Sequence, residues 1–189
     1  MKKKGLAMVL ALVLLAVCAV SGTLAWLTAK SDTVTNTFTT SDIKVELTET
    51  NETYKMVPGY DIHKDPKAKV LAGSEECFLF VKLEKSSNFD TYLEYAIADG
   101  WTQLTTDKDG KAISDLVYYR KVLTKDIGTA YSVLANDQVT VSGDITKEMM
   151  NAFTAANLPK LTITAYASQL YKSAGVEFTA AEAWANVTP

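Results

Sequence analysis

The amino-acid sequence predicts a mainly β protein, an antiparallel jelly-roll-like sandwich with a few short helical insertions. Threonine makes up 22 of the 164 residues from Trp26 onward, and with Val, Tyr and Phe it favours strands over helices. Several windows alternate apolar and polar side chains with a period of two, which is typical of half-buried strands. No sequence repeat or long linker divides residues 41–189, so we expect a single β-sandwich domain there.

Seven or so short strands are expected along this domain. Six windows carry a strand pattern of their own: Ile43–Thr48, Cys77–Leu83, Trp101–Thr105, Leu116–Val122, Gln138–Ser142 and Leu161–Ala167. Cys77–Leu83 is apolar on both faces, which predicts a central strand. Asp109-Gly110 separates two of the windows and predicts the tip of a hairpin turn, in preference to a calcium loop.

Three further windows favour helices. Thr146–Phe153 has Asp144 or Thr146 as its N-cap. Thr179–Trp184 is a short helix with Glu182 at the capping-box position. Ser87–Ala98 fits either a helix or a strand.

The N-terminal segment, residues 1–25, has the layout of a secretory signal peptide. Lys2–Lys4 form a basic start, and Gly5–Val20 is an unbroken apolar stretch that is short for a membrane-spanning helix. Thr23 and Ala25 are small residues at the −3 and −1 positions of a cleavage site. We therefore expect cleavage that makes Trp26 the first residue of the mature chain.

Two alternatives to this cleavage stay open. The segment can remain attached as an N-terminal anchor. A lipoprotein modified at Cys18 is disfavoured, because Val17 is bulkier than the small residue required before such a cysteine.

Composition and charge exclude several classes of function. Cleavage after Ala25 leaves 16 basic and 22 acidic residues, a net charge of −6, which argues against a nucleic-acid partner. Cys77 is then the single cysteine, so no internal disulfide is possible. It lies in an apolar run, where burial is expected rather than reactivity.

Three motifs in the first third of the chain carry a family resemblance. They are Gly22-Thr23-Leu24-Ala25-Trp26-Leu27-Thr28, Asn36-Thr37-Phe38-Thr39 and Met56-Val57-Pro58-Gly59-Tyr60-Asp61-Ile62. Together they resemble the TasA/camelysin-like family of secreted Gram-positive proteins, whose signal peptides are removed by a SipW-type signal peptidase. Ser41 and Asp42 depart from the pattern, because a Gly is common there in the family.

The resemblance implies two different functions. TasA-like members are subunits of biofilm matrix fibres with a jelly-roll core, and they polymerise when the N-terminal strand of one subunit completes the sheet of the next. Camelysin-like members are classed as metallopeptidases. The first reading implies a protein of the extracellular matrix or cell surface of a Gram-positive bacterium. Its partners would be other copies of itself, related matrix or anchor proteins and the SipW-type signal peptidase.

The peptidase reading finds no support in the residues. A zinc peptidase needs about three protein ligands and a general base. His63 is the single histidine, and the His-Glu-x-x-His signature is absent. We therefore expect no enzyme activity, no catalytic residues, and no metal or cofactor site.

The fibre reading rests on residues 26–40, the candidate donor strand. Within Asp32–Thr39, an extended chain places Val34, Asn36 and Phe38 on one face, and the other face is nearly all Thr. Such a strand can pair with an open sheet edge but has too little apolar surface to fold alone. An ordinary first strand within its own domain fits these residues equally well, and the resemblance favours exchange between subunits.

A third reading is a monomeric cell-surface binding module. Five aromatic residues could form a patch that contacts carbohydrate or peptide: Trp101, Tyr118, Tyr119, Tyr131 and Tyr166.

Overall fold

The computed structural model describes Gly5, residues 42–51 and residues 53–187. The chain divides into two units, Met1–Thr39 and Thr40–Pro189. All residues of the two hydrophobic cores described below belong to the second unit, which therefore has a core of its own. Among the described residues, the helices are all too short or too polar to cross a membrane.

A four-stranded antiparallel sheet forms one layer of this unit. Its strand order is β10-β4-β7-β6, with β10 at Leu161–Gln169, β4 at Cys77–Lys85, β7 at Ala112–Val122 and β6 at Thr102–Thr106. β4 pairs along its whole length with β10 and is also paired with β7. It is therefore a central strand, as predicted, and β10 and β6 are the two edges.

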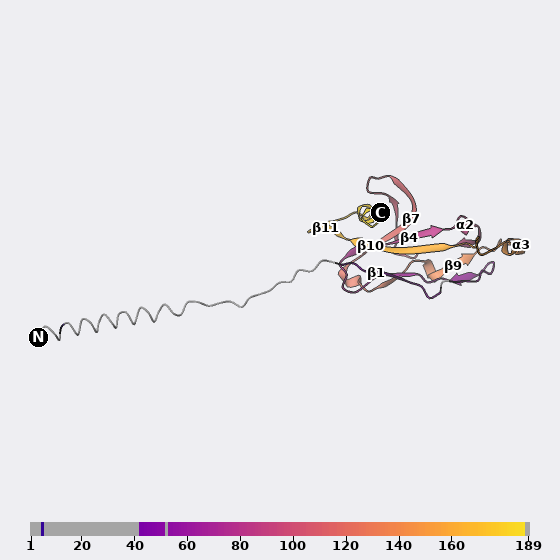
Figure 1. Ribbon diagram of the computed structural model, residues 1–189, viewed down its shortest axis with the longest axis horizontal. Coiled ribbons are helices and arrows are strands. Elements are labelled where there is room, and N and C mark those ends of the chain that lie inside the picture. Colours follow the sequence, from indigo (N-terminus) through magenta and orange to yellow (C-terminus); the bar gives the residue numbers. More distant parts are fainter. Residues whose placement is uncertain (1–4, 6–41, 52, 188–189) are drawn as a thin grey trace. The chain divides into compact units, whose positions relative to one another are not determined.

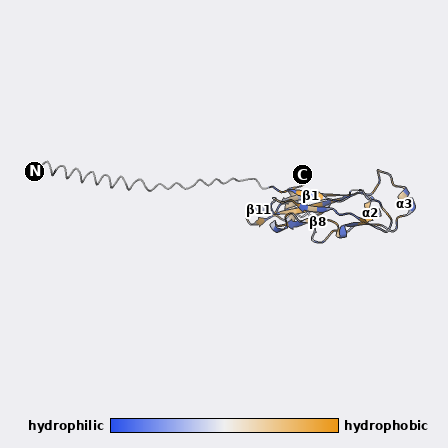
Figure 2. Ribbon diagram, turned by 90° about the horizontal axis from the view of Figure 1, so that it is seen from below, coloured by the Kyte–Doolittle hydropathy of each residue, from blue (hydrophilic) through white to orange (hydrophobic). Residues whose placement is uncertain are grey.

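Two smaller antiparallel sheets form the second layer. One has the order β1-β3-β8, from Val45–Thr48, Lys67–Val70 and Ala130–Ser132. The other has the order β2-β9-β5, from Asp61–His63, Gln138–Val141 and Leu93–Glu94. Figure 1 shows β10, β4 and β7 on one side of the unit and β1 and β9 on the other. Figure 2 shows hydrophobic and hydrophilic residues side by side along the strands near β1 and β8.

Strand β4 explains how the layers are held together. Its odd-numbered residues from Cys77 to Leu83 belong to the larger core cluster, together with residues of β3, β7 and β9. Phe78 and Phe80 point to the opposite face, where Phe80 lies 5.2 Å from the Trp184 ring, between centroids. Trp184 belongs to α4 (Ala180–Ala185), so this helix covers the outer face of the sheet. The antiparallel β-sandwich predicted from the sequence is confirmed.

The predicted elements map onto the observed ones with few changes. All six predicted strands are present, as β1, β4, β6, β7, β9 and β10. α3 (Lys147–Asn151) is capped by Thr146, and α4 has the predicted capping box, in which Thr179 and Glu182 bond reciprocally. Asp109-Gly110 lies in the hairpin turn between β6 and β7.

The ambiguous window Ser87–Ala98 contains one turn of helix, α2 (Phe89–Tyr92), followed directly by β5. Two 3₁₀ turns lie at Thr124–Asp126 and Ala135–Asp137.

Five short strands are additional to those predicted. They are β2, β3, β8 and the hairpin of β11 (Tyr171–Ser173) with β12 (Val176–Glu177). β3 does alternate, since Ala68 and Val70 are fully buried and Lys67 and Lys69 are partly exposed. With four residues, two of them lysines, the pattern is too short to stand out from a loop.

Candidate assembly groove

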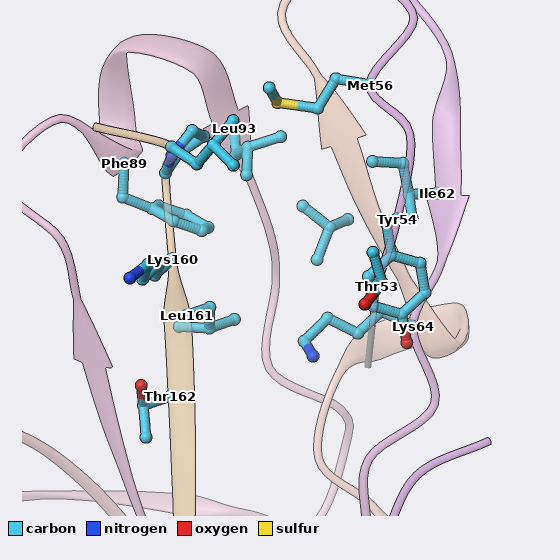
Figure 3. A pocket seen from close by; sticks show the side chains of 13 residues that line it. Thr53, Tyr54, Met56, Ile62, Lys64, Phe89, Leu93, Lys160, Leu161 and Thr162 are labelled. Atoms are coloured by element: carbon cyan, nitrogen blue, oxygen red, sulfur yellow. The ribbon is translucent and has the colours of Figure 1, made fainter. Parts of the chain in front are cut away.

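A cavity of about 400 Å³ lies between β10 of the four-stranded sheet and β2 of the opposite layer. We call it the β10–β2 groove. Its apolar lining comes from Met56, Ile62, Phe89, Leu93, Val139 and Leu161. Figure 3 shows Leu161 and Thr162 on β10, across the cavity from Ile62 and Lys64. The groove thus separates the edge strands of two facing sheets.

The floor of the groove is part of the domain core. Phe89, Leu93 and Val139 are exposed at only 1%, 8% and 3%. Phe89 starts the single turn of α2, where its N–H donates to Ser86 O over 2.9 Å. Ser86 also exchanges two bonds with Lys160: its N–H donates to Lys160 O (3.0 Å) and its hydroxyl accepts from Lys160 N (2.9 Å). These contacts fix the floor to the residue directly before β10.

The opposite wall is held by polar contacts that leave little unbalanced charge. Lys64 Nζ lies 2.6 Å from Glu49 Oε1 and 5.3 Å from the centroid of the Tyr54 ring, and Tyr54 donates its hydroxyl hydrogen to Glu49. Nearby, the Asp65 carboxylate accepts the Thr50 hydroxyl (2.7 Å) and backbone N–H (3.0 Å). The hydroxyl bond is the main reason why the pKa of Asp65 is below its usual value. The wall therefore presents Ile62 and the aromatic ring to the cavity with its main cation already paired.

Both strands that flank the groove have one free edge. Among the described strands, β10 pairs only with β4, and β2 pairs only with β9. β10 runs for nine residues and β2 for three. β1 lies close to β10 but is not joined to it in a ladder. Alternate N–H and C=O groups on this side of β10 thus have no ladder partner among the described strands, and the part next to the groove, from Leu161, lies away from the end at Ala167–Gln169 that Asp42 and Ile43 approach.

The site residues predicted from the sequence fall outside the described residues. These are Thr23, Ala25 and Trp26 at the expected cleavage site and Val34, Asn36 and Phe38 on the expected assembly strand. They stay predictions. What the structure describes is an unpaired edge of β10 beside an apolar cavity.

The histidine and cysteine considered for chemistry lie apart from each other. His63 ends β2 with a side chain 66% exposed, and its Nε2 is 4.0 Å from Asp65 Oδ2. Cys77 is fully buried at the start of β4, as expected, and burial raises the pKa of its thiol to about 11. Within residues 42–51 and 53–187, no three His, Cys, Asp or Glu side chains come together in a way that could hold a metal ion.

The five aromatic residues of the binding-module reading do not form one patch. Trp101, Tyr118 and Tyr131 pack against the core between the layers. Tyr119 and Tyr166 belong to the cluster on the outer face of the four-stranded sheet, under α4. Tyr166 meets Trp184 edge-on at 5.3 Å between ring centroids. Most of this aromatic surface is used in packing.

No local pattern in the sequence indicates the groove, because its walls come from segments about a hundred residues apart. The nearest hint is Leu158, which precedes β10 and is 43% exposed although it is a large apolar residue. In comparisons with protein-family models, curated proteins and solved structures, this chain matched none.

Proposed function

We propose that this protein is a secreted structural subunit of extracellular matrix fibres, made by a Gram-positive bacterium. In this proposal the segment Asp32–Thr39 of one subunit adds to the free edge of β10 in the next and fills the β10–β2 groove. The observation that carries the proposal is the position of the groove, an apolar cavity directly beside a long unpaired strand edge. Related matrix or anchor proteins and a SipW-type signal peptidase are the further partners that the family resemblance suggests.

The acceptor strand is β10 rather than β2 because of length. An added strand gains main-chain hydrogen bonds in proportion to the edge that it meets. β10 offers nine residues and β2 three. The added strand then directs alternate side chains, Val34 and Phe38, toward the cavity floor at Leu93 and Val139.

A first strand of the same chain and a segment from another subunit could both pair with the edge of β10. The family resemblance, rather than the geometry, favours a segment from another subunit.

Side-chain burial and main-chain pairing both favour assembly. Burying Val34 and Phe38 contributes roughly 1.5–3 kcal/mol each, and the ladder along β10 adds to this. A one-residue slip would turn both side chains away from the cavity, so Asn36 between them helps to set the register.

Electron microscopy and light scattering of the chain from Trp26 to Pro189 test the proposal. We expect filaments, and we expect a variant lacking Trp26–Thr39 to stay a folded monomer, because the described core residues all belong to the second unit. Phe38→Asp should block growth, since it would place a charge in an apolar groove. A synthetic Asp32–Thr39 peptide should cap growing chains in trans.

Two results would contradict the proposal. If the variant lacking Trp26–Thr39 polymerises as well as the complete mature chain, strand exchange is wrong. If the complete mature chain stays monomeric at high concentration at both acidic and neutral pH, a monomeric binding module becomes the better reading.

A further inference from the structure

Arg120 is the single arginine of a chain that contains 18 lysines, and its position is unusual. It lies near the end of β7, two residues from Tyr118 and two from Val122. It therefore shares their face of the strand, which is the face between the layers. Its guanidinium carbon is 3.5 Å from the centroid of the Tyr131 ring and 5.3 Å from that of the Trp101 ring. A planar guanidinium stacks on aromatic faces in a way that a lysine ammonium does not.

The guanidinium has no charged partner among the described residues. None of the ion pairs and hydrogen bonds of residues 42–51 and 53–187 involves Arg120. Its Nε is buried and has no acceptor, whereas the two terminal nitrogens are not buried. Burial is the main influence on the pKa of Arg120 and lowers it, while Tyr131 and Asp126 act in the opposite direction. The guanidinium is thus only partly buried, and its two terminal nitrogens keep N–H donors that an acceptor from outside can use.

The surroundings hold the guanidinium in one orientation. The Trp101 indole N–H donates to Ser132 O over 2.9 Å, which fixes that ring. Gly100 lies against the terminal nitrogens: a Cβ at this position would be 3.0 Å from Arg120 Nη2, and its φ of +85° favours glycine. The Tyr131 ring is the nearer of the two, at 3.5 Å from the guanidinium carbon, and its stacking leaves the edge of the guanidinium as the direction in which its N–H groups point.

We propose that Arg120 binds the carboxylate of an aspartate or glutamate side chain on a partner polypeptide. A carboxylate is planar and accepts two parallel N–H bonds from a guanidinium approached in its plane. Trp101 and Tyr131 also pack against the core, so little of either ring is left for a sugar, and this favours a peptide over an acidic carbohydrate. Arg, Trp and Tyr are the residues most enriched at protein–protein hot spots.

The location of Arg120 fits a polypeptide partner. Trp101 directly precedes β6, the second edge of the four-stranded sheet, and Tyr131 lies on β8, an edge of the facing sheet. The site therefore lies on the side of the sandwich away from β10, where the Trp101 indole already occupies Ser132 O of β8. It is separate from the β10–β2 groove, so the inference does not depend on the fibre proposal.

Because the chain has one arginine, nuclear magnetic resonance of ¹⁵N-labelled Thr40–Pro189 gives a single arginine Nε–H signal that needs no assignment. We expect N-acetylglutamate amide to shift this signal and the Trp101 indole signal in a saturable way, and equal concentrations of chloride to leave both unchanged. Arg120→Lys keeps the charge but loses the planar pair of donors, so the Trp101 response should weaken at least about tenfold.

Three results would overturn the inference. The first is an absence of any saturable shift with the glutamate derivative. The second is equal binding by the Arg120→Lys variant, which would mean that only charge matters. The third is tighter binding of glucuronate than of the glutamate derivative, which would assign the site to acidic carbohydrate.

Discussion

Leu158 offers the sharpest test of the groove, because it lines the cavity and is still 43% exposed. Full burial of a leucine side chain is worth roughly 1.5–3 kcal/mol, so covering the exposed part on assembly contributes about 0.6–1.3 kcal/mol. Leu158→Asp removes this contribution and also places a carboxylate against an apolar strand, which costs several kcal/mol. We expect a total loss of at least about 3 kcal/mol, or a rise of about 100-fold in the lowest concentration that supports growth.

Val176→Asp is the matched control. Val176 is a large apolar residue exposed to a similar degree, 47%, but it lies on β12 and away from the groove. The same change there should leave growth unaffected, and thermal unfolding should verify that both variants keep the fold. Sedimentation of the assembled fraction over a concentration series measures the effect. If Leu158→Asp grows at the wild-type concentration, or if both variants are impaired equally, the groove is not the acceptor.

Three further predictions concern processing, metal content and acid stability. N-terminal sequencing of secreted protein should begin at or within a few residues of Trp26, and intact Met1 on a cell-surface form would indicate an anchor instead. Metal analysis of untagged protein should give well below one zinc per chain; stoichiometric zinc together with peptidase activity lost in His63→Ala would disprove this. Hydrogen bonds from threonines lower the pKa values of Asp65 and Glu76 in the folded state. Their stabilising contribution is therefore present above the unfolded pKa values near 4 and is lost as the pH falls through the folded values. Urea unfolding between pH 5 and about 2 should show decreasing stability, and a flat profile would contradict the assignment.

The extent to which the sequence predicts this fold depends on how many local signals agree. β4 was predictable because apolar residues occupy both of its faces, and α4 because Thr179 and Glu182 form a capping box. β3 carries the right alternation but only over four residues, with lysines on its outward face. β8 and the β11–β12 hairpin consist of two or three half-exposed or exposed residues each, whose pairing is decided by tertiary contacts.

The candidate sites were less predictable than the fold, for a physical reason. The β10–β2 groove exists because two sheets face each other with their edges apart, a property of packing rather than of any segment. Arg120 is prominent in the sequence as the single arginine, yet only its stacking on Tyr131 and its lack of a partner mark it as a binding residue. The five aromatic residues of the binding-module reading show the opposite. The sequence suggests one surface patch, and the structure divides these residues between two cores.

The pairing of β4 with β10 also determines when this chain can fold. Cys77 is opposite Gln169 and Lys85 is opposite Leu161. The central strand β4 can therefore pair with β10 only when residues 76 to 92 positions further along the chain are available. Closing such long loops is slow compared with forming local hairpins. The outer face of β4 is covered only when Trp184, close to the C-terminus, is in place. A chain that emerges from the ribosome or from a translocation channel N-terminus first therefore cannot complete its four-stranded sheet until β10 has emerged, and removal of α4 should lower stability because it uncovers Phe80.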